Sequence, residues 1–263
     1  MMKIALIIAY DGTAYSGWQR QADTSATVQE KLETAIASVA DHDISVICAG
    51  RTDAGVHATG QVVHFETSAD RSTRSWIRGI NTHLPSDINV RLAKQVDDGF
   101  HARFSAMRRC YSYIIDNSRL SPLAVNRLGT TWIYEPLNID MMHTASRCLL
   151  GEHDFSAYRS SVCQAKSALK TIYQLDIERR GEYVILQIEA NAFLHHMVRN
   201  IAGVLTAIGS GQQPEAWCKE VLDAGDRTLG GVTAKASGLY LTGVGYPEKF
   251  GMKVLDTQIM MVT

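Results

Sequence analysis

The most informative stretch of the sequence is Ala49-Gly50-Arg51-Thr52-Asp53-Ala54-Gly55-Val56-His57-Ala58-Thr59-Gly60-Gln61. It places an arginine, an aspartate and a histidine between glycines, with apolar segments at 45–48 and 61–66 on either side. The flanking segments have the pattern of strands, which predicts a loop between two strands of a sheet. Loops held by a rigid sheet often carry functional residues.

The side chain of Asp53 has two interpretations in such a loop. A carboxylate there suits a nucleophile or a general base. The same residues also suit a plain turn, in which Asp53 accepts hydrogen bonds from backbone N–H groups. From residue types alone, the plain turn is the commoner of the two.

The composition is that of an ordinary globular protein, with 263 residues, 46% of them hydrophobic and 20% charged. Five cysteines are scattered singly without a C-x-x-C pair, which argues against a disulfide framework or a zinc site and favours a reduced, cytoplasmic setting. The apolar run after Lys3 ends at Tyr10-Asp11. It is too short to cross a membrane, so we expect a buried strand and no membrane association.

The charge is distributed unevenly along a chain whose net charge is only −1. Residues 71–109 hold eight Lys or Arg and three Asp, a net charge of +5. A local basic surface binds phosphates even when the whole molecule is nearly neutral. On its own this is weak evidence, because most charged segments are simply solvated surface.

The periodicity along the chain predicts alternating strands and helices. Predicted strands are 3–9, 45–48, 61–66, 89–96, 111–116, 170–178, 183–189 and 239–245. Predicted helices are 28–39, which follows a Thr27–Glu30 capping box, and 76–82, 139–150 and 193–208. The fold class is therefore α+β, with two mixed halves and mainly antiparallel sheets on either side of a central cleft. We expect an N-terminal half at 1–105, a C-terminal half at 106–247 and a tail at 248–263.

Two further stretches mix aromatic, cationic and imidazole side chains. Phe104-Ser105-Ala106, followed by Arg108 to Tyr113, suits a nucleotide, though an amphipathic strand explains it too. In the predicted helix 193–208, Arg199 lies beside the apolar face and needs either solvent or an anionic partner. His195 and His196 would diverge by about 100° on a helix, so we expect no metal there.

Several motifs together resemble the bacterial TruA-type tRNA pseudouridine synthases over nearly the whole chain. They are Tyr10-Asp11-Gly12-Thr13 with Gly17-Trp18-Gln19, Gly50 to His57, Phe104-Ser105-Ala106 with Tyr111-x-Tyr113, Gly151-x-His153-Asp154-Phe155, His196 to Asn200, Gly238-Leu239-Tyr240-Leu241 and Tyr246-Pro247. They follow one another in the order that this family has.

The resemblance implies a pseudouridine synthase fold and a role for each matching residue. Asp53 would be the nucleophile, Arg199 would pair with it, and Tyr111 would contact the target uridine. Arg51 would help to extrude the base, and Leu239 would line the pocket. The resemblance further implies a homodimer that acts on the anticodon arm of tRNA, at positions thirty-eight to forty, without metal or organic cofactor.

Two other interpretations remain open at this point. A non-catalytic RNA-binding module would need the basic segment and the tyrosines but not Asp53. A metal-dependent hydrolase would use His57, His64, His195 and His196, although their spacing suits a metal poorly.

Overall fold

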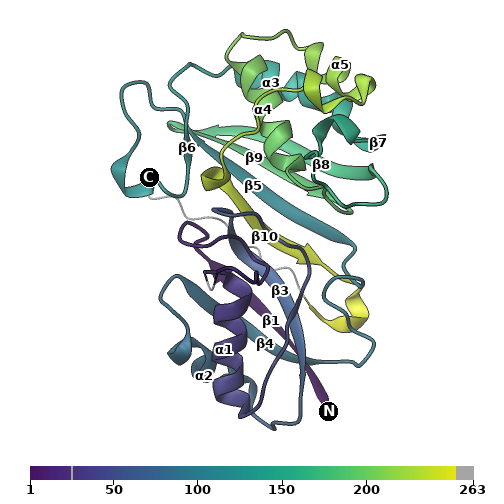
Figure 1. Cartoon of the computed structure of the whole chain (residues 1–263). Coiled ribbons are helices and arrows are strands. Elements are labelled where there is room, and N and C mark those ends of the chain that lie inside the picture. The colour runs from purple at the N-terminus through teal and green to yellow at the C-terminus, as the bar shows by residue number, and fades with distance from the viewer. Residues whose placement is uncertain (25, 253–263) are drawn as a thin grey trace. The chain divides into compact units, whose positions relative to one another are not determined.

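The computed structural model describes residues 1–24 and 26–252, and the chain forms two compact units (Figure 1). Of the described residues, unit 1 contains 1–107 and 240–252, and unit 2 contains 108–239. Of the predicted tail 248–263, residues 253–263 lie outside the described residues. Among the described residues, no helix has the length and apolar character needed to span a membrane.

Unit 1 is a sheet with two helices on one face (Figure 1). Its strands are β1 (Met2–Tyr10), β2 (Ile47–Cys48), β3 (His57–Thr67), β4 (Ile88–Val96) and β10 (Leu239–Gly245), and its helices are α1 (Val28–Ala40) and α2 (Thr73–His83). The strand order is β4-β1-β3-β10, and β2 pairs with β3. β3 and β10 are parallel, and the other pairs are antiparallel.

Helix α1 begins where the capping residue predicts. The hydroxyl of Thr27 accepts a hydrogen bond from the backbone N–H of Glu30, which satisfies one of the free donors of the first turn. Val28, Leu32 and Ala35 are buried against the sheet, as the spacing predicted.

Unit 2 has five strands and three α-helices. Its strands are β5 (Arg108–Asp116), β6 (Thr131–Trp132), β7 (Gly151–Asp154), β8 (Leu169–Arg180) and β9 (Tyr183–Ala190), and its helices are α3 (Ile139–Ser146), α4 (Met197–Gly209) and α5 (Trp217–Ala224). The order is β5-β9-β8-β7, and β6 pairs with β5 in parallel. Mixed strands and helices with mainly antiparallel pairing confirm the α+β class.

The division of the chain gives β10 a particular place. It follows unit 2 in the sequence, yet Tyr240 and Leu241 pair in parallel with His57 and Ala58 of β3. No sequence signal distinguishes a strand that pairs with its own half from one that returns to the other. The boundaries 1–105 and 106–247 stay a prediction about domains.

The predicted helix 193–208 begins later than its apolar pattern suggested. Helix α4 starts at Met197, and His196 has a left-handed backbone with φ of 64°. Leu194 is buried all the same, because a turn closed from the Met197 N–H to its carbonyl directs it inward. The apolar residue at position 194 continues the helical spacing in the sequence, so the predicted helix started too early, over residues that are not helical.

Candidate active site

The Asp53 loop, residues 49–56, joins β2 to β3 in unit 1 and is fixed from behind by the N-terminal segment. The backbone N–H of Trp18 donates to the carbonyl of Thr52 at 3.0 Å. The hydroxyls of Tyr10 and Thr52 lie 2.7 Å apart in a buried hydrogen bond. Both the main chain and the side chain of the residue before Asp53 are thus held.

Two glycines of the N-terminal segment touch this loop where no side chain would fit. A Cβ at Gly12 would lie 2.0 Å from the carbonyl oxygen of Val56. At Gly17, where φ is 98°, it would lie 3.0 Å from the carbonyl oxygen of Thr52. The motif at residues 10–19 is therefore the support of the Asp53 loop, which explains its glycines physically.

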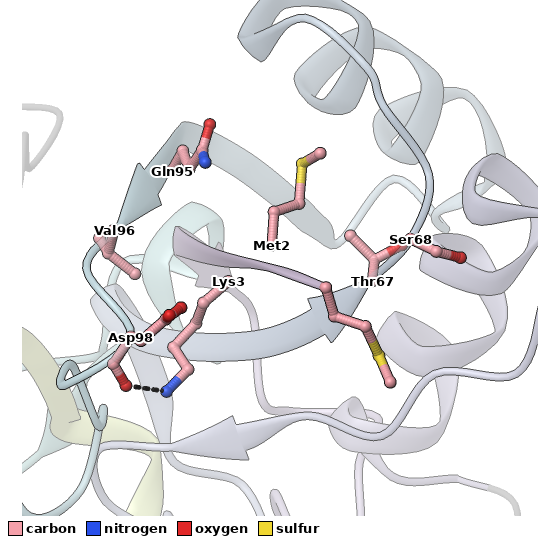
Figure 2. Close-up of a pocket in the computed structure, with 8 residues that line it drawn as sticks. Met2, Lys3, Thr67, Ser68, Gln95, Val96 and Asp98 are labelled. Carbon is pink, nitrogen blue, oxygen red and sulfur yellow. Dashed lines mark hydrogen bonds between the residues drawn. The ribbon is translucent and has the colours of Figure 1, made fainter.

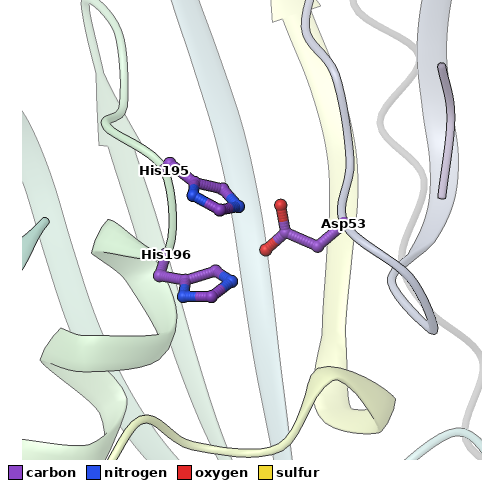
Figure 3. A group of neighbouring side chains, drawn as sticks. All are labelled: Asp53, His195 and His196. Carbon is purple, nitrogen blue, oxygen red and sulfur yellow. The ribbon is translucent and has the colours of Figure 1, made fainter. Parts of the chain in front are cut away.

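Asp53 itself begins a tight turn. The N–H of Val56 donates to the Asp53 carbonyl at 3.1 Å, and Gly55 supplies the positive φ, 76°, that the turn requires. The Asp53 side chain is half-buried and projects from the loop (Figure 3). A fixed backbone that presents a carboxylate in this way suits a nucleophile.

His57 is a buried structural partner of the same loop, at 3% exposure. Its Nδ1 lies 3.1 Å from both the N–H of Gly12 and Oδ1 of Asp11. We assign Nδ1 as the acceptor, because the buried Gly12 N–H needs one and Asp11 already accepts from Thr13. The ring also stacks on Tyr240 at 4.7 Å. The sequence pointed to His57 as a possible metal ligand, and its position instead makes it a support.

The pKa of Asp11 reflects the same contacts. Partial burial acts to raise it, but the hydrogen bonds from the hydroxyl and the backbone N–H of Thr13 outweigh that effect and lower the pKa. Asp11 is therefore an ionised carboxylate at neutral pH.

Arg51 precedes Asp53 by two residues and is exposed. Its positive charge acts on the pKa of the Cys48 thiol. Burial raises the pKa of that thiol to about 11, while Arg51 and Arg103 act in the opposite direction. An exposed guanidinium on the Asp53 loop is available to an anionic ligand.

Tyr111 lies on β5 of unit 2, opposite Ile188 of β9. Its half-buried ring meets Phe193 edge to face, with centroids 5.1 Å apart and an interplanar angle of 83°. Such a contact fixes the orientation of the ring.

Arg199 lies in the first turn of α4 and is half-buried. Its Nε donates to the carbonyl of Ala234 at 2.7 Å, and the N–H of Ala234 donates back to the Arg199 carbonyl at 3.1 Å. Burial raises the pKa of Tyr113 to about 12, and the nearby positive charge of Arg199 opposes that rise. The guanidinium is therefore positioned by the 230–235 loop and lies among buried groups of unit 2.

Asn200, next to Arg199, has a positioning role that sequence reasoning missed. It is fully buried, and its Nδ2 donates to the carbonyl of Tyr158 at 2.7 Å. Its Oδ1 accepts from Arg227 at 3.1 Å and from Thr233 at 2.7 Å. An asparagine beside the arginine predicted for the site was the available signal, because a buried asparagine must find several partners.

Leu239 is buried at the start of β10, directly after a glycine in close backbone contact. A Cβ on Gly238 would lie 2.6 Å from the carbonyl oxygen of Ile114 on β5. Because Gly238 has no side chain, the backbone can approach β5 closely, and this contact fixes the position of Leu239.

The argument that His195 and His196 diverge on a helix is wrong, because both precede α4. Their rings lie side by side, with centroids 4.0 Å apart and an interplanar angle of 35° (Figure 3). Of the other histidines named for a metal site, His57 and His64 use Nδ1 to accept backbone N–H groups.

A cavity of about 490 Å³ in unit 1 lies at the ends of β1, β3 and β4 (Figure 2). Its lining residues are Met1, Met2, Lys3, Thr67, Ser68, Gln95, Val96 and Asp98. None of the predicted site residues lines it, so we assign it no part in the active site.

The α+β fold is the one that the sequence predicted for an enzyme acting on RNA. The predicted site residues are divided between the units, with Arg51 and Asp53 in unit 1 and Tyr111, Arg199 and Leu239 in unit 2. The arginines of the basic segment are exposed at positions 71, 74, 78, 91, 103 and 108.

Comparison with known proteins specifies the family. The sequence profile described as tRNA pseudouridine synthase matches residues 6–105 and 145–247, and the chain belongs to that family. It is 54% identical over 250 residues to proteins named tRNA pseudouridine synthase A from Escherichia fergusonii, Escherichia coli O1:K1 / APEC and Shigella boydii serotype 18. Each match covers 95% of this chain and 92% of the relative. The matched ranges include every predicted site residue except Tyr111.

Proposed function

We propose that this chain converts uridine to pseudouridine at positions thirty-eight to forty in the anticodon arm of tRNAs, with Asp53 as the nucleophile. This chain belongs to the tRNA pseudouridine synthase family, whose members isomerise uridine to pseudouridine in tRNA. The observation that supports the role of Asp53 is its loop, which the N-terminal segment holds by hydrogen bonds and close glycine contacts.

The reaction needs a carboxylate and no second substrate. The C1′–N1 bond of uridine breaks, the uracil turns over, and a C1′–C5 bond forms. An ionised aspartate stabilises or captures the electron-poor sugar carbon, as a carboxylate does in retaining glycosidases. No electrons leave the substrate, so the residues proposed here need no redox cofactor.

The other predicted residues serve Asp53 and the base. The positive charge of Arg199 favours the ionised carboxylate, because an opposite charge nearby stabilises that form. Leu239 contributes an apolar surface under the base. Arg51 contacts the RNA as the base leaves the stem.

The target base must leave its stack before it can react. Unstacking costs a few kcal/mol, and stacking on an aromatic ring returns roughly 1–3 kcal/mol. Tyr111 is proposed as that ring, already oriented by Phe193. Tyr111→Phe should then retain most of the tRNA affinity that Tyr111→Ala loses. Equal loss in both variants would mean that stacking is not its contribution.

A homodimer is the proposed assembly. In unit 2 the apolar segment, residues 119–134, exposes six large apolar side chains: Leu120, Leu123, Val125, Leu128, Trp132 and Tyr134. Only Arg119 and Arg127 carry charge there. Sparse charge and large apolar groups suit contact with another protein surface better than contact with RNA.

The cytoplasm is the proposed compartment. A tRNA substrate and five cysteines without a disulfide suit action there.

Incubation of unmodified tRNA with wild type, Asp53→Ala and Asp43→Ala tests the catalytic role. Asp43 is an exposed aspartate before β2 and serves as the matched control. We expect pseudouridine at positions thirty-eight to forty with wild type and Asp43→Ala, and none with Asp53→Ala. Equal conversion by Asp53→Ala would refute the mechanism, and no conversion by wild type would favour the RNA-binding module. Loss of wild-type activity with a chelator, restored by zinc, would instead support a metal enzyme.

A further inference from the structure

A short turn in unit 1, residues 101–105, presents an aromatic ring to solvent on a rigid support. The turn is closed by its own polar groups. The N–H groups of Arg103 and Phe104 both donate to Nδ1 of His101, at 3.2 and 3.1 Å. The N–H of Ser105 donates to the His101 carbonyl at 2.9 Å, and the His101 N–H donates to Oγ of Ser105 at 3.1 Å.

The residues just before this turn are anchored in the core of unit 1. Phe100 is fully buried against Tyr246 and Phe250, with ring centroids 5.0 and 5.3 Å apart. Nζ of Lys3 donates to the carbonyls of Asp98 and Phe100, and its bond to Asp98 is drawn in Figure 2.

Ala102 ties the turn to two neighbouring strands. Its N–H donates to Nδ1 of the buried His64 on β3 at 3.1 Å. Its carbonyl accepts from the hydroxyl of Tyr246, which follows β10, at 2.6 Å. The turn therefore rests on a support of buried hydrogen bonds and aromatic contacts.

On this support Phe104 is 78% exposed. The His101 ring lies beside it, with centroids 4.4 Å apart and an interplanar angle of 31°, and Cζ of Arg103 lies 5.6 Å from the ring centroid. A single exposed apolar residue needs no explanation. Here, however, the backbone that presents the ring is fixed on all sides, and a guanidinium accompanies it. Preorganised groups of this kind lower the entropic cost of binding.

Building on the proposed function, we propose that Phe104 stacks on an unpaired nucleobase of the bound tRNA while Arg103 contacts the adjacent phosphate. Every base offers a π face, so an exposed ring binds unpaired RNA without strict sequence preference. Arginine suits phosphate because its planar donors pair with two oxygens. This contact would be separate from Tyr111, which lies in unit 2 and is proposed to meet the target uridine.

The surroundings favour RNA over a protein partner. The basic segment, whose net charge is +5, includes both Arg103 and Phe104. Besides Phe104, the 100–107 stretch exposes only one large apolar side chain, Met107 at 59%. A protein interface buries about 800 Å² per partner, far more than these two side chains supply.

The test uses the full chain and an unmodified tRNA transcript. Phe104→Ala, Phe104→Trp and Arg103→Gln are compared with wild type in tRNA affinity, KM and kcat. Tyr173→Ala is the matched control, because Tyr173 is an aromatic on β8 with 54% exposure and no proposed role. Thermal unfolding of each variant reports whether the turn still supports the fold.

We expect Phe104→Ala to weaken tRNA binding and raise KM by about five- to a hundredfold, with kcat within about threefold of wild type. Phe104→Trp should restore binding, because it restores the π face. Arg103→Gln should reduce the slope of log affinity against log salt by roughly one. Tyr173→Ala should change none of these.

Two results would overturn the inference. One is a Phe104→Ala variant with wild-type affinity and KM. The other is lost affinity that Phe104→Trp does not restore and that accompanies a lower Tm, which would make the ring structural. Both are read against a wild type that forms pseudouridine. A wild type that binds tRNA without converting it would contradict the proposed function alone, and the affinities of the variants would still decide on Phe104.

Discussion

The Asp53 loop of unit 1 and the apolar segment 119–134 of unit 2 both follow a strand, but they differ in how closely they are packed and in what they expose. Around the Asp53 loop, hydrogen bonds hold the backbone and two glycines approach it so closely that a methyl group would collide. The apolar segment is also held by hydrogen bonds, from the N–H groups of Ser118 and Leu123 to the buried Asp116, from Asn126 to the hydroxyl of Tyr183, and through the pairing of β6 with β5. Between these contacts, large apolar side chains face water.

This difference fits the two roles proposed for these regions, catalysis and self-association. A group that does chemistry must be held to within a fraction of an ångström, so its loop is packed from behind. A surface that associates needs exposed apolar area on a defined backbone. The family profile spans the first region and leaves out residues 106–144, which include the second.

The largest effect is expected from closing the space behind the Asp53 loop. In Gly12→Ala, the new methyl group would overlap the Val56 carbonyl, at 2.0 Å, and must displace the loop. We expect a loss of several kcal/mol of stability or failure to fold, since backbone cannot yield as a flexible side chain does. Urea unfolding and pseudouridine formation measure it.

Gly50→Ala is the matched control for that substitution. Gly50 lies in the same loop, and a Cβ there would meet nothing within 4 Å. Its stability should stay within about 1 kcal/mol of wild type. A stable, fully active Gly12→Ala variant would show that the loop is not held from behind.

The second effect concerns β3, which continues from the Asp53 loop. Burial first, then the charges of His101 and Lys3, lower the pKa of His64 to about 4, while Glu66 acts in the opposite direction. In the unfolded state His64 has an ordinary pKa near 6.5. Between about pH 6.5 and pH 4 it therefore binds a proton in the unfolded state that it does not bind in the folded state. Stability should therefore fall as the pH drops from about 6.5 towards 4, by roughly 1–3 kcal/mol from this residue.

Urea unfolding at several pH values checks this expectation. In His64→Asn the amide oxygen can still accept the Ala102 N–H but cannot titrate, so the dependence on pH should flatten over this window. An unchanged slope in His64→Asn would assign the acid sensitivity to other groups.

The sequence predicted those parts of the structure that local signals determine, and it missed those that tertiary packing determines. The Asp53 loop, its flanking strands and α1 were predictable, because glycines, a capping threonine and apolar periodicity are local signals. The start of α4 was not, since Leu194 is buried from a turn and not from a helix. Helix α5 was missed because it has only eight residues, of which just Cys218, Val221 and Leu222 are buried, too few for a clear helical period.

The roles of individual residues were less accessible than the elements that carry them. His57 and Asn200 hold their neighbours through bonds to Gly12 and Tyr158, which lie more than forty residues away in the sequence. Such partners are set by tertiary packing, which no local pattern encodes.

A smaller effect is expected at the hydroxyl that supports Thr52. Tyr10→Phe removes the 2.7 Å hydrogen bond and keeps the ring, so stability should fall by about 1 kcal/mol. Activity should fall more than stability implies, because the residue before Asp53 loses a restraint. Measuring kcat at a temperature where both proteins stay folded separates the two. An unchanged kcat would mean that the backbone contacts alone position Asp53.

The smallest effect on stability is expected in the apolar segment. Leu120→Ser with Val125→Ser changes side chains that are 96% and 79% exposed, so unfolding of the isolated chain should shift by no more than about 0.5 kcal/mol. Association should change strongly: sedimentation should show a wild-type dimer and a variant shifted to monomer. Val162→Ser, exposed at 71% outside this segment, should remain a dimer. A wild type that is monomeric at micromolar concentration would remove the proposed role of the segment, while leaving the support of Asp53 untouched, because the two regions serve separate ends.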